Sequence, residues 1–372
     1  MQPSASGPSE CLNKPTTNTP TRQLAQNGRN AMKLLAAALA LVVLAGCVGK
    51  ESTTTLPKPG GAAPATGKKI TVAMLPKKKG VPYFTSCAEG AEEAAKELGN
   101  VELIYDGPTS GDPSEAAKLI DQWSAQGVDV IAVSPNDPAV LGPAMKRARD
   151  AGVKVITWDA DADPASREFL VNQATPEEIG FALVDSMAAD LGGESATGDV
   201  AIVTATLTAA NQNEWIKHMK TRLEKYPGLK LVATKPSNED QKLAFSVTQD
   251  LIKVYPNLKG VFAISSTAFP GAAEAVKQAG KSGTVMVNGL STPNDMRTYV
   301  NDGVVKSVIL WNTKDLGYLT VFAARALVDG DLKSGSTTIK AGRLGEKKVV
   351  GDNVMLGGTI TFTKENIAEF DF

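Results

Sequence analysis

The sequence is poor in the residues on which metal and hydrolytic chemistry depend. Its 372 residues include one histidine, His218, and three cysteines that lie far apart in the chain, Cys11, Cys47 and Cys87. A zinc site normally takes three or four ligands from cysteine, histidine and carboxylate side chains, and no such cluster can be assembled from this sequence. A Ser-His-Asp triad would depend on His218 alone, which falls within a predicted helix. We therefore expect no metal site, and most hydrolytic and metal-dependent chemistry is not expected.

The sequence also lacks an excess of positive charge. Lysine and arginine total 39, aspartate and glutamate total 40, and the formal net charge is −1. Proteins that bind nucleic acids neutralise phosphates with a surplus of lysine and arginine. The charge balance therefore argues against a nucleic-acid partner.

The apolar run near the N-terminus is too short to span a membrane. Residues 34–45 are twelve consecutive apolar residues that follow Met32 and Lys33, whereas a membrane-spanning helix needs about 20. Such a run is typical of the central region of an export signal. It ends in Leu-Ala-Gly-Cys, which resembles a bacterial lipobox, so Cys47 is the predicted lipidated N-terminus of the mature protein. An ordinary signal peptide and a buried apolar helix are the alternatives.

Residues 1–46 are thus predicted to be an export signal, with the true start at Met32 because residues 1–31 show no apolar period. Residues 47–68 are rich in Thr, Pro, Gly and Ala, which predicts a flexible tether with a reach of roughly 25 Å. Lipid on Cys47 would anchor an exported protein to a bacterial membrane, in the periplasm or at the cell surface. It would also leave Cys87 without a disulfide partner, so we expect Cys87 to be a small buried side chain.

The remaining sequence alternates between strand and helix patterns. Strands are predicted at 70–75, 101–105, 130–133, 155–158, 200–204, 229–234, 260–264 and 284–287. Helices are predicted at 85–98, 113–126, 140–151, 177–191, 212–226, 241–255 and 271–279. The strands are short apolar runs without polar alternation, as in parallel sheets that helices cover on both faces. The predicted fold class is α/β, and the length favours two domains over one.

An internal similarity predicts how these units are arranged. Residues 128–159 and 258–290 both give a strand, a serine-containing loop, a helix with basic residues near its end, a glycine and a second strand. A repeated βαβ unit indicates two similar Rossmann-like lobes with parallel sheets, joined by a hinge. The predicted divisions are an N-terminal lobe of 69–173 plus about 312–336, a C-terminal lobe of 174–311, and a C-terminal tail of 337–372 that crosses the hinge.

Ligands of open α/β sheets bind beyond the carboxyl ends of the strands. Phosphate-binding glycine loops are missing at these positions, which instead carry carboxylate, amide, hydroxyl and aromatic groups. Such groups suit a small, neutral, hydroxyl-rich ligand. The candidate ligand-binding residues are Lys77, Tyr83, Phe84, Asp159, Asn211, Gln212, Trp215, Ser265, Ser266, Ser291, Trp311 and Asn312.

Several candidates have a purely structural interpretation. Asp159 could cap a turn, and Lys77 opens a run of three lysines of the kind that lies on a solvated edge. Asn211 and its neighbours could cap the next helix, and Trp215 could belong to the core. Asp161, two residues from Asp159, is expected to face solvent or the hinge.

Distinctive motifs span almost all of 69–372: GVPYFTSCAEGAEEAAKELG, YDGPTSGD, VKVITWDAD, NQNEWIKHMK, STPNDMRTYVNDG, LWNTKDLGY, AGRLG and FTKENIAEFDF. In combination they resemble the periplasmic sugar-binding proteins of ABC importers, within the branch that binds rhamnose or autoinducer-2. The resemblance implies the type I periplasmic binding protein fold, a monomer without cofactor or catalysis, and delivery of a small-molecule sugar to an ABC permease in the inner membrane.

The resemblance carries over to site residues only in part. Lys77, Asp159 and Gln212 match ligand contacts of the autoinducer-2 proteins, whereas Asn211 stands where those proteins have a carboxylate. Their later Pro and Ala correspond here to Ile264 and Ser266. Because a lost carboxylate removes a strong hydroxyl acceptor, we expect a monosaccharide, such as the 6-deoxyhexose rhamnose, rather than autoinducer-2.

Sugar that bridges both lobes would favour their closed arrangement, about hinge segments near 172–175, 310–312 and the C-terminal tail. Four other functions compete with this one. A glycosidase would need Asp159 and Asp161 as its carboxylate pair, yet residues two apart on one extended segment cannot easily flank a glycosidic bond. A sugar-responsive repressor would carry a basic helix-turn-helix where this chain has a lipobox. A sugar-sensing subunit for a membrane receptor remains an alternative, as does uptake of autoinducer-2 as a signal.

Overall fold

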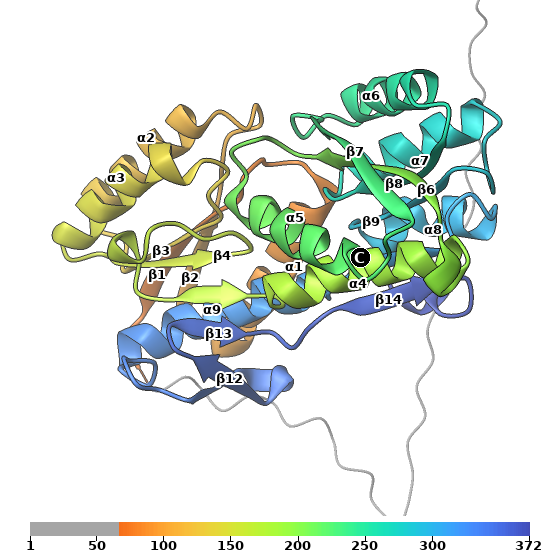
Figure 1. Ribbon diagram of the computed structural model, residues 1–372. Coiled ribbons are helices and arrows are strands. Elements are labelled where there is room, and N and C mark those ends of the chain that lie inside the picture. The colour runs from red at the N-terminus through yellow and green to blue at the C-terminus, as the bar shows by residue number, and fades with distance from the viewer. Residues whose placement is uncertain (1–66) are drawn as a thin grey trace, which may run out of the picture. The chain divides into compact units, whose positions relative to one another are not determined.

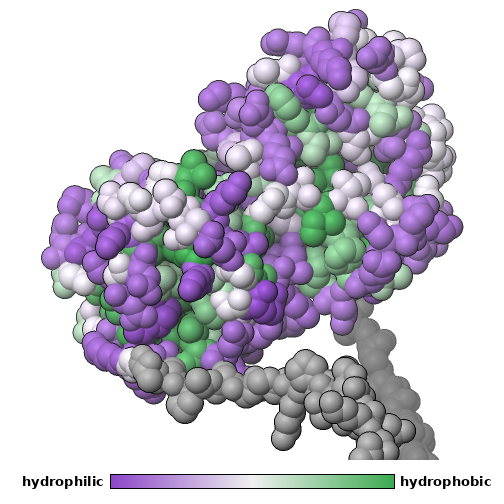
Figure 2. All heavy atoms as spheres, turned by 90° about the horizontal axis from the view of Figure 1, so that it is seen from below, coloured by the Kyte–Doolittle hydropathy of each residue, from purple (hydrophilic) through white to green (hydrophobic). Residues whose placement is uncertain are grey.

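The computed structural model describes residues 67–372. The predicted export signal, the start at Met32, the lipidation site Cys47 and nearly all of the predicted tether lie outside the described residues. No helix within 67–372 is both long enough and apolar enough to cross a membrane. The face in Figure 2 is a mixture of hydrophilic and hydrophobic side chains, with hydrophilic ones along most of its outline.

The first sheet has eight strands in the order β11-β12-β13-β5-β4-β3-β1-β2. The pairs from β13 to β2 are parallel, and β12 and β11 are added antiparallel at one edge. Its strands are β1 (Ile70–Leu75), β2 (Val101–Tyr105), β3 (Val130–Val133), β4 (Lys154–Trp158), β5 (Leu170–Asn172), β11 (Thr338–Lys340), β12 (Glu346–Val350) and β13 (Asn353–Met355).

The second sheet has four parallel strands in the order β7-β6-β8-β9. They are β6 (Gly198–Thr204), β7 (Leu229–Pro236), β8 (Leu258–Ala263) and β9 (Met286–Gly289). An antiparallel pair, β10 (Ser307–Leu310) with β14 (Ile360–Thr363), lies beside β9 through a bridge between Leu290 and Ile309. Each predicted repeat contains two parallel strands that are paired with each other, β3 and β4 in residues 128–159 and β8 and β9 in residues 258–290. The βαβ similarity is therefore confirmed.

Helices cover both faces of the first sheet, as Figure 1 shows. On β1, Ala73 and Leu75 join the core beneath α2 (Pro113–Gln126) and α3 (Pro138–Asp150). The alternate residues, Val72 and Met74, join the core beneath the other two helices of this sheet. Those helices are α1 (Pro82–Leu98) and α9 (Thr313–Asp329), which pack against each other. Burial on both faces explains why these strands have no polar alternation.

Five helices pack around the second sheet and the β10–β14 pair. They are α4 (Pro176–Asp190), α5 (Ala210–Leu223), α6 (Gln241–Val254), α7 (Ala268–Gln278) and α8 (Pro293–Asn301), which lies against β10. Helices α4 and α5 pack together, and so do α6 and α7. The chain passes from one sheet to the other at three places: residues 173–175, 311–312 and 356–359. These passages fall in the segments where the sequence places the hinge.

Several helices begin before their predicted starts. Helices α1 and α3 start at Pro82 and Pro138, whereas the predicted starts were 85 and 140. Proline is favoured in the first helical turn because its missing N–H has no partner there anyway. Asp137 caps α3 by accepting from the backbone N–H groups of Ala139 and Val140. The elements beyond residue 290, including α8, α9 and the C-terminal strands, were not assigned individually from the sequence.

Helices α1 and α9 approach each other closely at two glycines. A side-chain Cβ at Gly90 would lie 1.8 Å from the backbone oxygen of Lys314, and one at Gly317 would lie 1.8 Å from the backbone oxygen of Cys87. Small side chains also lie along α1, where Ala91 and Ala94 are fully buried. The seam between the two helices therefore requires glycine for steric reasons.

Gly317→Ala is expected to destabilise the protein by about 1–3 kcal/mol, since the added methyl group overpacks the seam and forces the backbones apart. Gly142→Ala in α3 is the matched control, because a Cβ there meets no atom within 4 Å. That control should instead stabilise the fold by roughly 0.5–1 kcal/mol through helix propensity. Urea unfolding of the purified variants measures both effects. Equal stability of the two variants would contradict the steric account.

Cys87 is completely buried in α1, as expected from the sequence. Burial, and then the nearby Asp159 carboxylate, raise the pKa of its thiol well above the ordinary value of 9.0. The folded protein therefore keeps the proton when the unfolded chain loses it. The stability that this provides is fully present below pH 9 and is lost as the pH rises above it.

Relative to Cys87→Ala, the wild-type protein should lose about 1.4 kcal/mol of unfolding free energy between pH 8 and pH 10. Urea unfolding at a series of pH values, with ionic strength held constant, gives this difference. Parallel pH profiles for the two proteins would mean that the thiol ionises as readily when folded as when unfolded.

Candidate functional site

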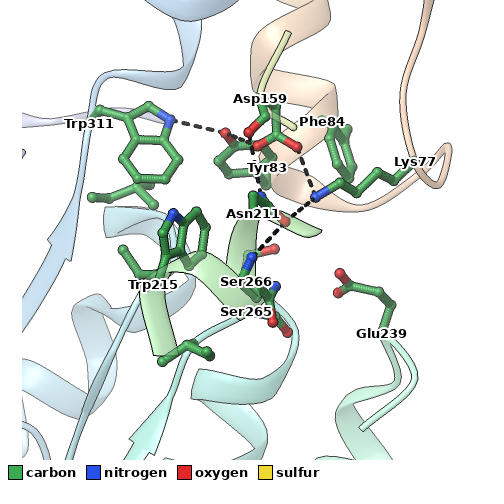
Figure 3. Close-up of a pocket in the computed structure, with 14 residues that line it drawn as sticks. Lys77, Tyr83, Phe84, Asp159, Asn211, Trp215, Glu239, Ser265, Ser266 and Trp311 are labelled. Atoms are coloured by element: carbon green, nitrogen blue, oxygen red, sulfur yellow. Dashed lines mark hydrogen bonds and ion pairs between the residues drawn. The ribbon is translucent and has the colours of Figure 1, made fainter. Parts of the chain in front are cut away.

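A small cavity lies where the carboxyl ends of strands from both sheets meet. Its volume is about 40 Å³. Figure 3 shows that side chains from both sheets and from the starts of helices point toward it. The lining residues are Lys77, Tyr83, Phe84, Asp159, Asn211, Gln212, Trp215, Glu239, Ile264, Ser265, Ser266, Leu290, Leu310 and Trp311.

Asp159 is the central polar group of the cavity wall. It directly follows β4 and is only 6% exposed. Its carboxylate accepts hydrogen bonds from the hydroxyls of Tyr83 (2.8 Å) and Ser134 (2.7 Å) and pairs with Lys77 Nζ at 3.1 Å. A buried carboxylate needs such partners, because an uncompensated one would be costly to remove from water. The first sheet and α1 thus hold this charge in one orientation.

The backbone of Asp159 is also unusual. Its φ of +63° lies in the left-handed region, which non-glycine residues seldom occupy. The Gln173 side-chain amide donates to the Asp159 carbonyl at 3.0 Å and supports this turn. The turn that follows is capped by Asp163, whose side chain accepts from the Ala165 N–H at 2.8 Å, and not by Asp159. Its backbone turns sharply away from β4, and its side chain faces the cavity (Figure 3).

Aromatic rings extend the network around Asp159. Trp311 Nε1 donates to the Tyr83 hydroxyl at 2.9 Å, and that hydroxyl donates onward to Asp159. The rings of Tyr83 and Trp311, and those of Trp311 and Trp215, meet edge to face with centroids 6.1 and 6.2 Å apart. Burial, and then the Asp159 charge, raise the pKa of Tyr83 well above its ordinary value. Tyr83 therefore stays protonated and remains a donor near neutral pH.

Asn211 connects the two sides of the cavity. Lys77 Nζ donates to Asn211 Oδ1 at 3.3 Å, and Asn211 Nδ2 donates to the Asp159 carbonyl at 3.4 Å. Gln212 lies beside it, and its Oε1 accepts from the Thr204 hydroxyl (2.5 Å) and the Ala205 N–H (2.8 Å). That orientation leaves the Gln212 amide nitrogen as a donor. The residue before α5 is Ala209, which makes no side-chain cap, and Asn211 lies in the first turn. Asn211 Oδ1 also accepts from the Gln212 N–H at 2.9 Å, so its side chain satisfies a free N–H of that turn as well as lining the cavity.

Ten of the twelve predicted site residues line the cavity, and two do not. Ser291 is completely buried and donates to the Ser266 carbonyl at 2.8 Å, so it supports a lining loop from behind. Asn312 accepts from the Asp315 N–H at 3.0 Å and caps α9. Both residues lie next to a lining residue, Leu290 and Trp311 respectively, but their own side chains form hydrogen bonds within the fold.

The structure also adds lining residues that the candidate list did not contain. Ile264, Leu290 and Leu310 supply an apolar part of the wall, at or just after the ends of β8, β9 and β10. Glu239 lies in the loop that follows β7. The strand-end rule would have found it if β7 had been predicted to reach Pro236 instead of ending at 234.

Asp159 and Asp161, the carboxylate pair that a glycosidase would need, do not face the same cavity. Asp161 accepts from the guanidinium of Arg167 and from the Thr157 hydroxyl and does not line the cavity, so it does not pair with Asp159. Residues 67–372 contain no cluster of three or more His, Cys, Asp or Glu side chains that could hold a metal ion. His218 packs edge to face against Phe181 in the α4–α5 contact.

Two known binding proteins are similar to this chain in sequence. The chain is 25% identical over 264 residues to the ribose import binding protein RbsB of Escherichia coli (strain K12), across 71% of this chain and 86% of RbsB. It is 28% identical over 276 residues to the D-ribose/D-allose-binding protein of Pseudomonas aeruginosa, across 72% of this chain and 83% of that protein.

Two solved structures are also similar. LsrB from Clostridium saccharobutylicum, in complex with AI-2, has a TM-score of 0.77 and 29% identity, and covers 82% of this chain and 100% of LsrB. An ABC transporter solute-binding protein from Clostridium phytofermentas with bound L-rhamnose has a TM-score of 0.77 and 29% identity. The match covers 82% of this chain and 98% of that protein.

These similarities confirm the predicted α/β fold and the resemblance inferred from the motifs. The relatives are binding proteins rather than enzymes, which confirms that expectation as well. Residues 72–332 match the profile of the periplasmic binding protein domain. The chain belongs to the family of periplasmic binding proteins.

Proposed function

We propose that this protein is the solute-binding lipoprotein of a sugar ABC transporter. It binds a rhamnose-like monosaccharide between two closing lobes and delivers it to the permease. Membership of the family supports the general role, and the relatives named for ribose and allose and the neighbour with bound L-rhamnose support a monosaccharide. The observation that carries the proposal is a buried carboxylate, Asp159, aimed at a cavity between two sheets.

The lining residues provide what a sugar requires. The Asp159 carboxylate accepts hydrogen bonds from hydroxyls, and the amides of Asn211 and Gln212 add donors. Trp215 and Trp311 present apolar surfaces against which the C–H groups of a sugar ring pack. Few polar groups on an apolar lining are the usual composition of a small-molecule site.

We propose that the walls of the cavity move when a sugar binds. About 40 Å³ has room for only a few water molecules, so a monosaccharide needs more space. The Lys77–Asn211 contact joins residues of the two sheets and must lengthen or rearrange when a sugar enters. We propose that the lobes hinge at 173–175, 311–312 and 356–359, and that bound sugar favours the closed arrangement.

Autoinducer-2 is the second candidate ligand, because the LsrB structure in complex with AI-2 is as similar as the one with L-rhamnose. Lys77, Asp159 and Gln212 suit either ligand. Asn211 favours the monosaccharide, since a neutral amide is a weaker hydroxyl acceptor than a carboxylate.

We further propose that Cys47 carries the lipid anchor, that residues 47–68 tether the monomeric protein to the membrane, and that the protein works outside the cytoplasm. Fractionation of cells that express wild type and Cys47→Ser tests the anchor. The variant should leave the membrane fraction.

The ligand proposal predicts a thermal shift with one monosaccharide. At 100 times its Kd, a bound sugar should add about 2.7 kcal/mol to the stability of the folded protein. A panel of L-rhamnose, ribose, galactose, xylose and autoinducer-2 measures this shift. Asp159→Ala should abolish it, whereas Asp150→Ala should keep it, because Asp150 is exposed and forms an ion pair with the exposed Lys146, away from the cavity.

A shift with autoinducer-2 alone would make signal uptake the function. The absence of any shift across the panel would contradict the sugar-binding proposal while leaving the fold unaffected.

A further inference from the structure

Glu239 brings a second carboxylate to the cavity. It lies in the loop between β7 and α6, where Asn238 and Glu239 both have φ of +52°. The loop is tied to the end of β6, because the N–H groups of Ser237 and Asn238 donate to the Ala205 carbonyl at 3.2 and 2.6 Å. Two successive left-handed residues are strained for side chains other than glycine. This backbone presents Glu239 to the cavity.

The carboxylate of Glu239 has an acceptor position to spare. Its Oε2 accepts from the Thr267 hydroxyl at 2.9 Å, and Thr267 lies within 3.1 Å of the Ser265 hydroxyl. Figure 3 shows the carboxylate directed toward the serines on that side of the cavity. An ionised carboxylate offers about four acceptor sites, so Oε1 can receive a further donor.

The charge of Glu239 is less well compensated than that of Asp159. Lys77 pairs with Asp159 at 3.1 Å, whereas no ion pair with Glu239 is found among residues 67–372. Lys78 Nζ donates to the Glu239 backbone carbonyl at 3.2 Å and not to its carboxylate, and Lys78 does not line this cavity. The lining itself therefore has two carboxylates and one lysine.

We infer that Glu239 determines ligand specificity: it accepts a hydroxyl of a neutral sugar and, through its charge, excludes sugar acids. This inference rests on the proposed sugar-binding function. A hydroxyl bound to a carboxylate forms a strong, charge-assisted hydrogen bond. A ligand carboxylate in the same place would meet a like charge and lose that donor.

The test uses neutral sugars with their acids: L-rhamnose with L-rhamnonate, D-ribose with D-ribonate, and D-galactose with D-galacturonate. Calorimetry gives the affinity of the wild type and of Glu239→Gln for each. The variant should bind the preferred neutral sugar at least about tenfold more weakly. It should also narrow the preference for that sugar over its acid by about tenfold or more.

Two further variants separate ligand contact from support of the loop. Thr267→Val removes the hydrogen bond to Oε2 but keeps the charge, so it should leave the discrimination against acids intact. Glu214→Gln is the matched control, because Glu214 is exposed on α5 and does not line the cavity. Its affinities should equal those of the wild type.

If the wild type binds a neutral sugar and Glu239→Gln retains both its affinity and its discrimination, the role of Glu239 is wrong and the proposed function stands. If Thr267→Val loses the preference for neutral sugars over their acids to the same extent as Glu239→Gln, the charge of Glu239 does not set that preference. Glu239 then acts only by supporting the loop. If the wild type binds no sugar of the set or of the thermal-shift panel, both proposals fail.

Discussion

The buried pairing of Asp159 with Lys77 is the interaction on which the site depends. Each of the two residues is 6% exposed, and burying either charge without the other would have a large desolvation cost. Hydroxyls of Tyr83 and Ser134 complete the partners of the carboxylate. These groups come from four different segments, which only the parallel order of β1, β3 and β4 brings to one edge.

The same arrangement connects the site to the proposed closure of the two lobes. Asp159 and Lys77 belong to the first sheet, while Asn211 and Glu239 belong to the second. Polar contacts join the two groups: Lys77 and the Asp159 carbonyl each bond to Asn211, and Lys78 donates to the Glu239 carbonyl. A ligand that replaces such contacts with its own hydroxyls can stabilise the closed arrangement.

Much of this was predictable from the sequence because buried parallel strands have a simple signature. The runs 70–75, 101–105 and 130–133 were predicted with the bounds that the structure gives. The strand-end rule then located Asp159 and Lys77 without knowledge of the fold. The C-terminal strands escaped because they are short and partly exposed, as in the Glu-Lys-Lys-Val-Val of β12.

Side-chain use was harder to predict than position. Ser291 and Asn312 follow strands as expected, yet one supports the Ser266 loop and the other caps α9. Glu239 was missed because β7 was predicted to end at 234, two residues before its end at Pro236, so the loop that holds Glu239 was not searched as a strand end. Such choices depend on neighbours from distant parts of the chain.

Small-angle scattering with and without sugar tests the central claim most directly, since that claim is a cavity formed by two lobes that close on their ligand. Saturation with the monosaccharide that the protein binds should reduce the radius of gyration, and the Asp159→Ala variant should show no change at the same concentration. A radius that stays constant while calorimetry reports saturation of the wild type would contradict closure between the lobes.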